Sequence, residues 1–190
     1  MTEQTAPATP PDRTTVSPWV VTDDTGAFLD FVTRVFEGVE LGRVATEDGM
    51  IGHAEIRIGD TVVLAFDRRA DWPELPSLLN VYVPDADAVV ERALAAGGRV
   101  VTEVADDAFG WRGGRIKDPF GSIWWVSAPV RELTEDEMWQ RLQEPVYAEG
   151  MRVAQETLDA ELSGRRRGRS SAPVRQDQGG SAAPVDPQRR

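Results

Sequence analysis

The feature that most constrains the fold of this 190-residue chain is a supersecondary pattern that occurs twice. In residues 17–67 a short apolar run precedes a segment with helical spacing of apolar residues, and three further strand-like runs follow. Residues 78–128 repeat this order of strand, helix and three strands. Arg57 and Arg115, each followed by isoleucine and 58 residues apart, align the copies. Two copies of one βαβββ unit are a more economical interpretation than one irregular fold.

Turn and cap residues mark the boundaries within each unit. Gly38 follows the first helical segment, where a C-cap glycine is common, and Asp48-Gly49 is typical of a hairpin turn. Asp85 or Asp87 is expected to cap the second helix. The run DPFG at 118–121 predicts a tight turn between the last two strands.

A helical segment follows the repeat, at residues 134–162. Thr134 and Glu137 have the spacing of a capping box. Pro145 interrupts the pattern, so we expect two helical pieces. Their expected role is to pack on the folded body or on a partner chain.

The ends of the chain differ in composition from its middle. Residues 164–190 carry seven Arg and two Asp, a charge of about +5, so residues 1–163 carry about −16 within the total of −11. Both ends are polar and poor in large apolar residues, which predicts disorder. The predicted organisation is a disordered N-terminus (1–15), a folded domain (16–130, with modules 16–67 and 78–130), a helical extension (131–163) and a disordered basic tail (164–190).

Composition also restricts the classes of function. The chain has no cysteine, which excludes a disulfide framework and thiolate metal sites. Its first residues lack the apolar core of a signal peptide, and no apolar run approaches the roughly 18 residues of a membrane span. An acidic body should repel nucleic acid. We therefore expect a cytoplasmic protein with no nucleic-acid or membrane partner. The alternative is that the basic tail is an arm that binds nucleic acid or a membrane surface.

The two units resemble the vicinal oxygen chelate superfamily, which groups glyoxalases, bleomycin-resistance proteins and extradiol dioxygenases. The similarity covers about residues 16–130, rests on the runs DGMIGHAEIRIGD and GRIKDPFGSIWW, and is greatest to the glyoxalase-like, bleomycin-resistance-like branch. It implies an α+β fold in which each module curls into a half-barrel and two modules form a cup. In that family the concave face binds the ligand, the enzymes hold a divalent metal there, and two chains often form a homodimer, sometimes by exchanging modules.

The resemblance allows the metal to be tested residue by residue. In metal-using members the ligands come from the first and fourth strands of each module. The corresponding positions here are Ser17, Leu64, Leu78 and Trp125. None is a good ligand for a divalent ion, and the chain has a single histidine, His53. We therefore predict no cofactor. The exception to weigh is Asp67, a carboxylate near the fourth-strand position that could still bind a metal.

Strand alternation and the resemblance together select the ligand-binding residues. In the run HAEIRI the polar residues share one face, and Trp125 is expected to face the cup while Trp124 packs under the helices. Trp111 is expected near the rim. The predicted ligand-binding residues are Trp19, His53, Glu55, Arg57, Asn80, Tyr82, Trp111 and Trp125. The alternatives are that His53 is only hydrogen-bonded to a neighbour on the polar face and that the aromatic residues belong to the core.

Three functions fit these observations. The first is a metal-free protein that binds a small molecule, cationic or aromatic, and sequesters it as antibiotic-resistance proteins do. The second is a metal-dependent enzyme, a glyoxalase-like lyase, an isomerase or a dioxygenase, using Zn, Ni, Mn or Fe with Glu55 or His53 as base. The third is an interaction module that binds a partner through an apolar stripe on residues 134–162. We predict the first, with no catalytic residue.

Overall fold

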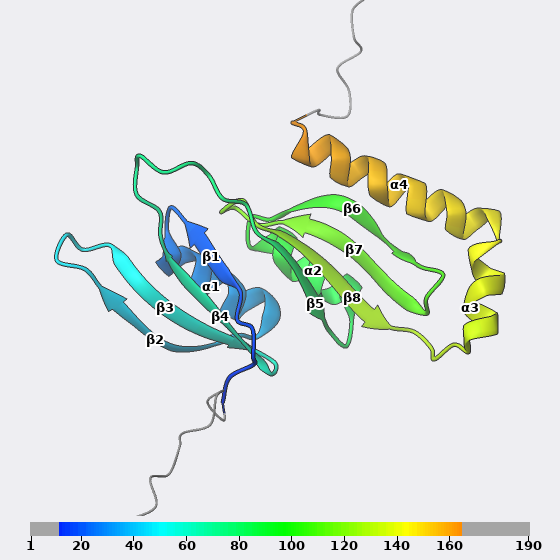
Figure 1. The fold of residues 1–190 in the computed structure, drawn as a ribbon, viewed down its shortest axis with the longest axis horizontal. Coiled ribbons are helices and arrows are strands. Elements are labelled where there is room, and N and C mark those ends of the chain that lie inside the picture. Colours follow the sequence, from blue (N-terminus) through cyan, green and yellow to red (C-terminus); the bar gives the residue numbers. More distant parts are fainter. Residues whose placement is uncertain (1–11, 165–190) are drawn as a thin grey trace, which may run out of the picture.

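The computed structural model describes residues 12–164, which form two βαβββ modules followed by two helices (Figure 1). The first module contains β1 (Trp19–Thr22), α1 (Thr25–Phe36), β2 (Val39–Ala45), β3 (Ile51–Ile58) and β4 (Thr61–Asp67). The second contains β5 (Leu78–Tyr82), α2 (Ala86–Ala95), β6 (Arg99–Asp106), β7 (Trp111–Lys117) and β8 (Ile123–Pro129). The extension contains α3 (Glu135–Leu142) and α4 (Pro145–Leu162). The predicted repeat is confirmed.

The predicted terminal disorder falls mainly on segments outside this description. Residues 1–11 and 165–190 are not among the described residues, so the disordered N-terminus and the basic tail stay predictions. Within residues 12–164 no helix is long and apolar enough to cross a bilayer.

Each module forms one mixed four-stranded sheet with the same connectivity. The strand orders are β1-β4-β3-β2 and β5-β8-β7-β6, and no strand pairing joins the two sheets within the described residues. In each sheet the first and fourth strands pair in parallel and the other neighbours are antiparallel. The α+β class that the sequence predicts is therefore confirmed.

One helix packs on one face of each sheet. The opposite face carries no helix from its own module and is called the helix-free face below. In Figure 1 both α1 and α2 lie behind the sheets, and the two helices contact each other. Trp124 of β8 is 2% exposed, and its ring centroid lies 4.5 Å from that of Phe36 at the end of α1. The apolar faces of both modules thus join in a single core.

The strand register corrects the alignment of the two copies. Glu55 lies opposite Leu64, as Arg115 lies opposite Trp125, and each pair continues to the first strand of its module. The equivalent of Arg115 is therefore Glu55, 60 positions earlier, and not Arg57. Corresponding positions on the helix-free faces carry opposite charges.

The end of α1 corrects a second expectation. The left-handed residue there is Glu37, with φ of 57°, and not Gly38. A Cβ at Gly38 would lie 2.8 Å from Cγ1 of Val32 and 3.0 Å from Cδ1 of Ile56. Glycine is needed at this position because the backbone passes directly over the core.

The extension packs on the second sheet, which is one of the two roles expected of it. Thr134 and Glu137 form the capping box of α3, and Pro145 is the first residue of α4. Helix α4 lies along β6, where Oγ1 of Thr157 is 2.7 Å from Oγ1 of Thr102. The edge strand of the second sheet thus has a helix packed against it, whereas β2, the corresponding edge of the first sheet, is exposed along its whole length.

Candidate functional site

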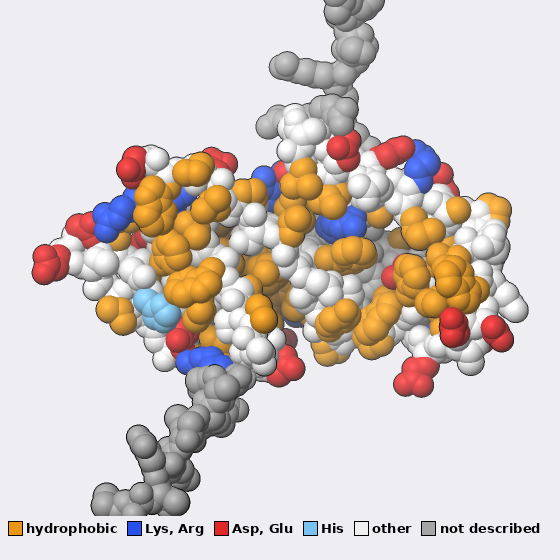
Figure 2. All heavy atoms as spheres, viewed as in Figure 1, with side chains coloured by type: hydrophobic (Ala, Val, Ile, Leu, Met, Phe, Trp, Pro, Cys, Tyr) orange, Lys and Arg blue, Asp and Glu red, His pale blue; other side chains and the backbone are white. Residues whose placement is uncertain are grey.

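The helix-free faces of the two sheets carry the residues that the sequence selects. Figure 2 shows hydrophobic side chains gathered over the first sheet, with the histidine beside them. Strand alternation assigns Trp124 and Trp125 to the correct faces, because Trp124 is buried and Trp125 is 44% exposed on the opposite face.

The first sheet holds a compact group around Trp19. The indole makes edge contacts with His53, at 5.5 Å between ring centroids, and with Phe66, at 5.3 Å. His53 Nε2 lies 3.2 Å from Glu55 Oε1, and Arg13 Nη2 donates to Glu55 Oε2 at 2.5 Å. Both oxygens of Glu55 thus have partners, and one of these partners is the guanidinium of Arg13.

Arg57 lies apart from this group. It is exposed, lies opposite Val39 near the end of β3, and makes no ion pair with another described residue. The structure gives Arg57 no contact with Trp19, His53 or Glu55.

The second sheet holds the other predicted residues. The rings of Tyr82 and Trp111 are 5.0 Å apart, and Asn80 Oδ1 accepts a hydrogen bond from Ser127 Oγ at 3.3 Å. Asn80 also lies beside Trp125 in the strand register. These four predicted residues therefore share one face. Within residues 12–164, ring contacts join members of each group but do not join the two groups.

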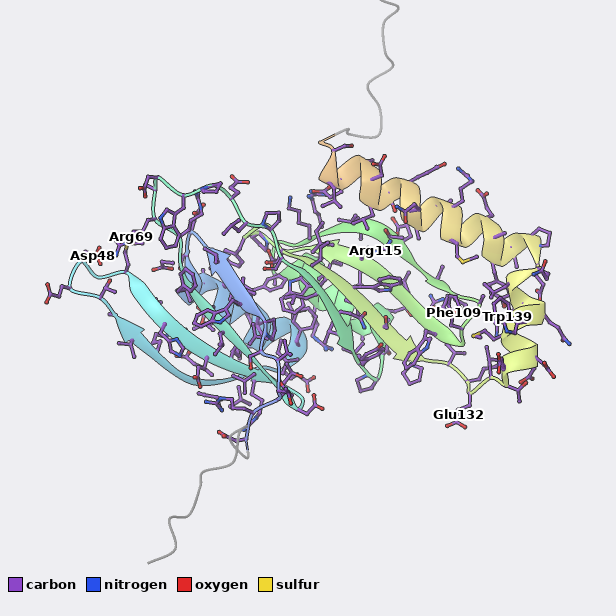
Figure 3. The ribbon with its side chains drawn as sticks, viewed as in Figure 1. Asp48, Arg69, Phe109, Arg115, Glu132 and Trp139 are labelled. Atoms are coloured by element: carbon purple, nitrogen blue, oxygen red, sulfur yellow. The ribbon has the colours of Figure 1, made fainter. Side chains whose placement is uncertain are left out.

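Sequence reasoning missed Arg115, which lies in the middle of the second sheet (Figure 3). It is 8% exposed, and burial lowers the pKa of its guanidinium from the ordinary value. Its Cζ lies 4.1 Å from the ring centroid of Trp125. Strand alternation could have identified it, because this alternation places Arg115, a charged residue, on the same face of the sheet as a tryptophan.

Besides a cavity between β5 and the Gly59-Asp60 turn, which Asn80 and Tyr82 help to line, two cavities border this region. One of about 190 Å³ lies on the second sheet and is lined by Leu78, Leu79, Asn80, Arg115, Ile123, Trp125 and Leu158. A larger one of about 490 Å³ lies between the modules, but its basic groups already pair with acids, Arg68 with Asp23, and both Lys117 and Arg99 with Glu161. The smaller cavity combines apolar walls with few polar groups, as ligand sites commonly do.

A divalent metal does not fit the residues present. The positions carried over from metal-using members are serine, leucine and tryptophan, and among the described residues no three His, Asp or Glu side chains converge. Asp67, the carboxylate near one such position, accepts the backbone N–H of Thr25 at 2.8 Å through one oxygen and that of Ile51 at 2.7 Å through the other. Its role in this fold is to hold α1 and β3 against the end of β4.

The family model for the Glyoxalase/Bleomycin resistance protein/Dioxygenase superfamily matches residues 12–126, which span both modules. The chain belongs to this superfamily. The resemblance inferred from the repeat is therefore confirmed, and the matched region ends before α3 and α4.

The sequence relatives add no activity to this assignment. The uncharacterized proteins Mb0911c of Mycobacterium bovis and Rv0887c of Mycobacterium tuberculosis are each 38% identical over 137 residues, covering 65% of this chain and 88% and 79% of theirs. The crystal structure of protein PA1353 from Pseudomonas aeruginosa is 19% identical, with a TM-score of 0.50, and covers 60% of this chain and 96% of that one. At this identity the structural likeness supports the fold alone.

Proposed function

We propose that this chain is a metal-free binding protein that sequesters a small aromatic molecule on the helix-free face of its second sheet. The observation that carries the proposal is the exposure of Trp125, at 44%, beside a cavity whose walls are mostly apolar. Tyr82 and Trp111 extend the aromatic surface along the same face. Such a surface gives a flat ligand stacking contacts worth about 0.5–1.5 kcal/mol each beyond the area buried.

Few donor groups among the described residues favour the metal-dependent alternative. His53 and Glu55 supply two donor groups, and Glu55 is already bound to Arg13. Elemental analysis of protein purified without chelator or affinity tag tests this point. We expect no stoichiometric Zn, Ni, Mn or Fe, and an ion held by three or more protein atoms would overturn the proposal.

Calorimetric titration tests the binding. The panel consists of flat neutral probes such as 2-naphthamide, cationic intercalators, and cationic glycopeptides of the bleomycin class. We expect at least one member to bind and Trp125→Ala to weaken it about 5- to 10-fold. Trp139→Ala is the matched control, because Trp139 is also exposed, at 55%, but lies on α3. Absence of binding across the panel, or equal losses in both variants, would refute the proposed site.

We further propose that the protein is a homodimer whose second copy covers the first sheet. Several large apolar side chains on β1 and β2 are exposed, namely Trp19 (48%), Val39 (51%), Leu41 (39%) and Val44 (63%). Strand β2 is also a bare sheet edge, which proteins usually cover or protect by charge. Sedimentation velocity should give twice the chain mass, and Val44→Lys should shift the protein toward the monomer.

A further inference from the structure

Arg115 is a buried cation in the centre of the face that we assign to ligand binding. It lies on β7 between Trp125 of β8 and Thr102 of β6, its neighbours in the strand register. Helix α4 closes the β6 side of this row (Figure 3), and the carbonyl oxygen of Ala154 in this helix accepts a hydrogen bond from the guanidinium. The residue is 8% exposed even though the sheet face around it is partly open.

No carboxylate of the described chain neutralises this cation. Nη1 of Arg115 donates to Thr102 Oγ1 at 3.3 Å and to the carbonyl oxygen of Ala154 at 2.8 Å, and neither acceptor is charged. Within residues 12–164 no acceptor faces Nε or Nη2. The other arginines of β6 and β7 behave differently, since Arg99 pairs with Glu161 and Arg112 with two aspartates.

The free nitrogens are the pair suited to a carboxylate. Nε and Nη2 project two N–H groups side by side, and this fork binds the two oxygens of a carboxylate with two parallel hydrogen bonds. A guanidinium that is largely buried without such a partner loses part of its hydration, and the stacking on Trp125 and the two bonds of Nη1 compensate this loss without neutralising the charge. The contacts of Nη1 therefore hold the guanidinium in place, while Nε and Nη2 have no acceptor among the described residues.

The surroundings define the rest of the ligand. Arg115 and Asn80 are the polar residues of a cavity of about 190 Å³, and Trp125 and Leu158 are among its apolar walls. This volume is below the roughly 300–1,000 Å³ typical of sites for drug-sized ligands. The cavity therefore suits a small acid, or the acidic end of a larger molecule.

We propose that this cavity binds a small aromatic organic acid, with its carboxylate on the Nε–Nη2 fork of Arg115 and its ring against Trp125 and Leu158. The inference rests on the proposed binding function and names the chemical class of its ligand. The acidic body, which by itself favours cations, acts mainly on the rate of long-range encounter. The charge at the contact is set by Arg115.

Titration calorimetry with three probes of the same ring system tests the inference on the full chain. The probes are 2-naphthoate, its neutral isostere 2-naphthamide, and the cation 2-naphthylmethylammonium. We expect 2-naphthoate to bind most tightly. Arg115→Met should weaken its binding about 10- to 100-fold and leave 2-naphthamide unchanged. Arg115→Lys, which keeps the charge but lacks the fork, should fall between the two.

Arg112→Met is the matched control, since Arg112 lies on the same strand but on the opposite face and is paired with acids. It should bind 2-naphthoate as the wild type does. Equal affinity for acid and amide, tightest binding of the cation, or an unchanged affinity in Arg115→Met would overturn the anion assignment and leave the proposed function standing. Failure of all three probes to bind would overturn the inference, and the proposed function would fall with it only if the intercalators and glycopeptides of its own panel also failed to bind.

A second copy of the chain could instead supply the missing carboxylate. In that case Arg115→Met would dissociate a dimer in sedimentation velocity and would not change 2-naphthoate binding, which refutes the inference. Circular dichroism of each variant, together with retained binding of 2-naphthamide, shows that the variant is folded. Should Arg115→Met fail this criterion, Arg115→Lys alone decides, because loss of the fork is expected to weaken the acid selectively.

Discussion

Asp118 makes a set of buried hydrogen bonds that asparagine cannot reproduce. The side chain is 4% exposed, and its Oδ1 accepts the backbone N–H groups of Phe120, at 3.0 Å, and Ser122, at 2.9 Å. Its Oδ2 accepts the indole N–H of Trp124 at 2.8 Å. An asparagine has a single acceptor oxygen, so its NH₂ group must face one of these donors. We expect Asp118→Asn to lower the free energy of unfolding by about 2–3 kcal/mol.

A double-mutant cycle separates this mechanism from a general loss of packing. Trp124→Phe removes the indole N–H and keeps a ring against Phe36, at a cost of about 1–3 kcal/mol. In the double variant the amide introduced by Asp118→Asn no longer faces a donor at that position. The double variant should therefore be more stable, by about 1–2 kcal/mol, than the sum of the two single losses predicts.

Urea unfolding followed by far-ultraviolet circular dichroism is the assay, because the tryptophan change would alter a fluorescence signal. Asp71→Asn, in an exposed loop, is the control and should change stability by no more than about 0.5 kcal/mol. Additive losses in the cycle, or an Asp118→Asn loss as small as that of the control, would refute the reasoning. The result also bears on function, because the anchored Trp124 fixes the face on which Trp125 lies.

Three further predictions concern the sheet, the cap and the pH dependence. Gly114→Ala would bring a Cβ within 2.7 Å of a β6 carbonyl oxygen and should lower the melting temperature by several degrees, whereas Gly42→Ala, with nothing within 4 Å, should not. Thr134→Ala should cost about 1 kcal/mol locally, seen as faster hydrogen exchange in α3 with an unchanged global unfolding midpoint. Hydrogen bonding to Arg99 holds the pKa of Glu161 below its ordinary value. The docking of α4 is therefore strongest at pH values above the ordinary pKa of a glutamate and weakens as the pH falls through the lowered pKa of Glu161. Hydrogen exchange in α4 should detect this dependence, and Glu161→Gln should abolish it.

The parts of the fold that depend on local signals could be predicted from the sequence. Apolar spacing predicted a helix after the first strand of the first module, where α1 lies, and the turns at Asp48-Gly49 and 118–121 separated the strands correctly. Alternation assigned Trp124 and Trp125 to opposite faces because their strand is regular. The alignment of the copies by the shared Arg-Ile pair was wrong, because identity of residue type does not determine strand register.

The missing parts depend on contacts between distant segments. Arg115 resembles any strand arginine until α4, about 40 residues later, covers it with Ala154. Likewise, nothing near Asp67 in the sequence shows that the backbone of Thr25 and Ile51 uses both of its oxygens. The sequence also did not show that the predicted binding residues divide into two separate groups. Strand alternation tells which face of a sheet a residue lies on, but it does not tell how far apart the faces of two sheets are.

The cover that α4 provides over β6 has a practical consequence for anyone who expresses the repeat alone. A fragment that stops at the end of the matched family region, residue 126, would lose the last three residues of β8 and would leave β6 without the helix that packs against it, so both sheets would have an edge strand with no helix against it. Fragments with two such open borders can add to one another indefinitely, so shortening this protein to its family-matched part would favour insoluble polymers, and a soluble fragment should extend through residue 162.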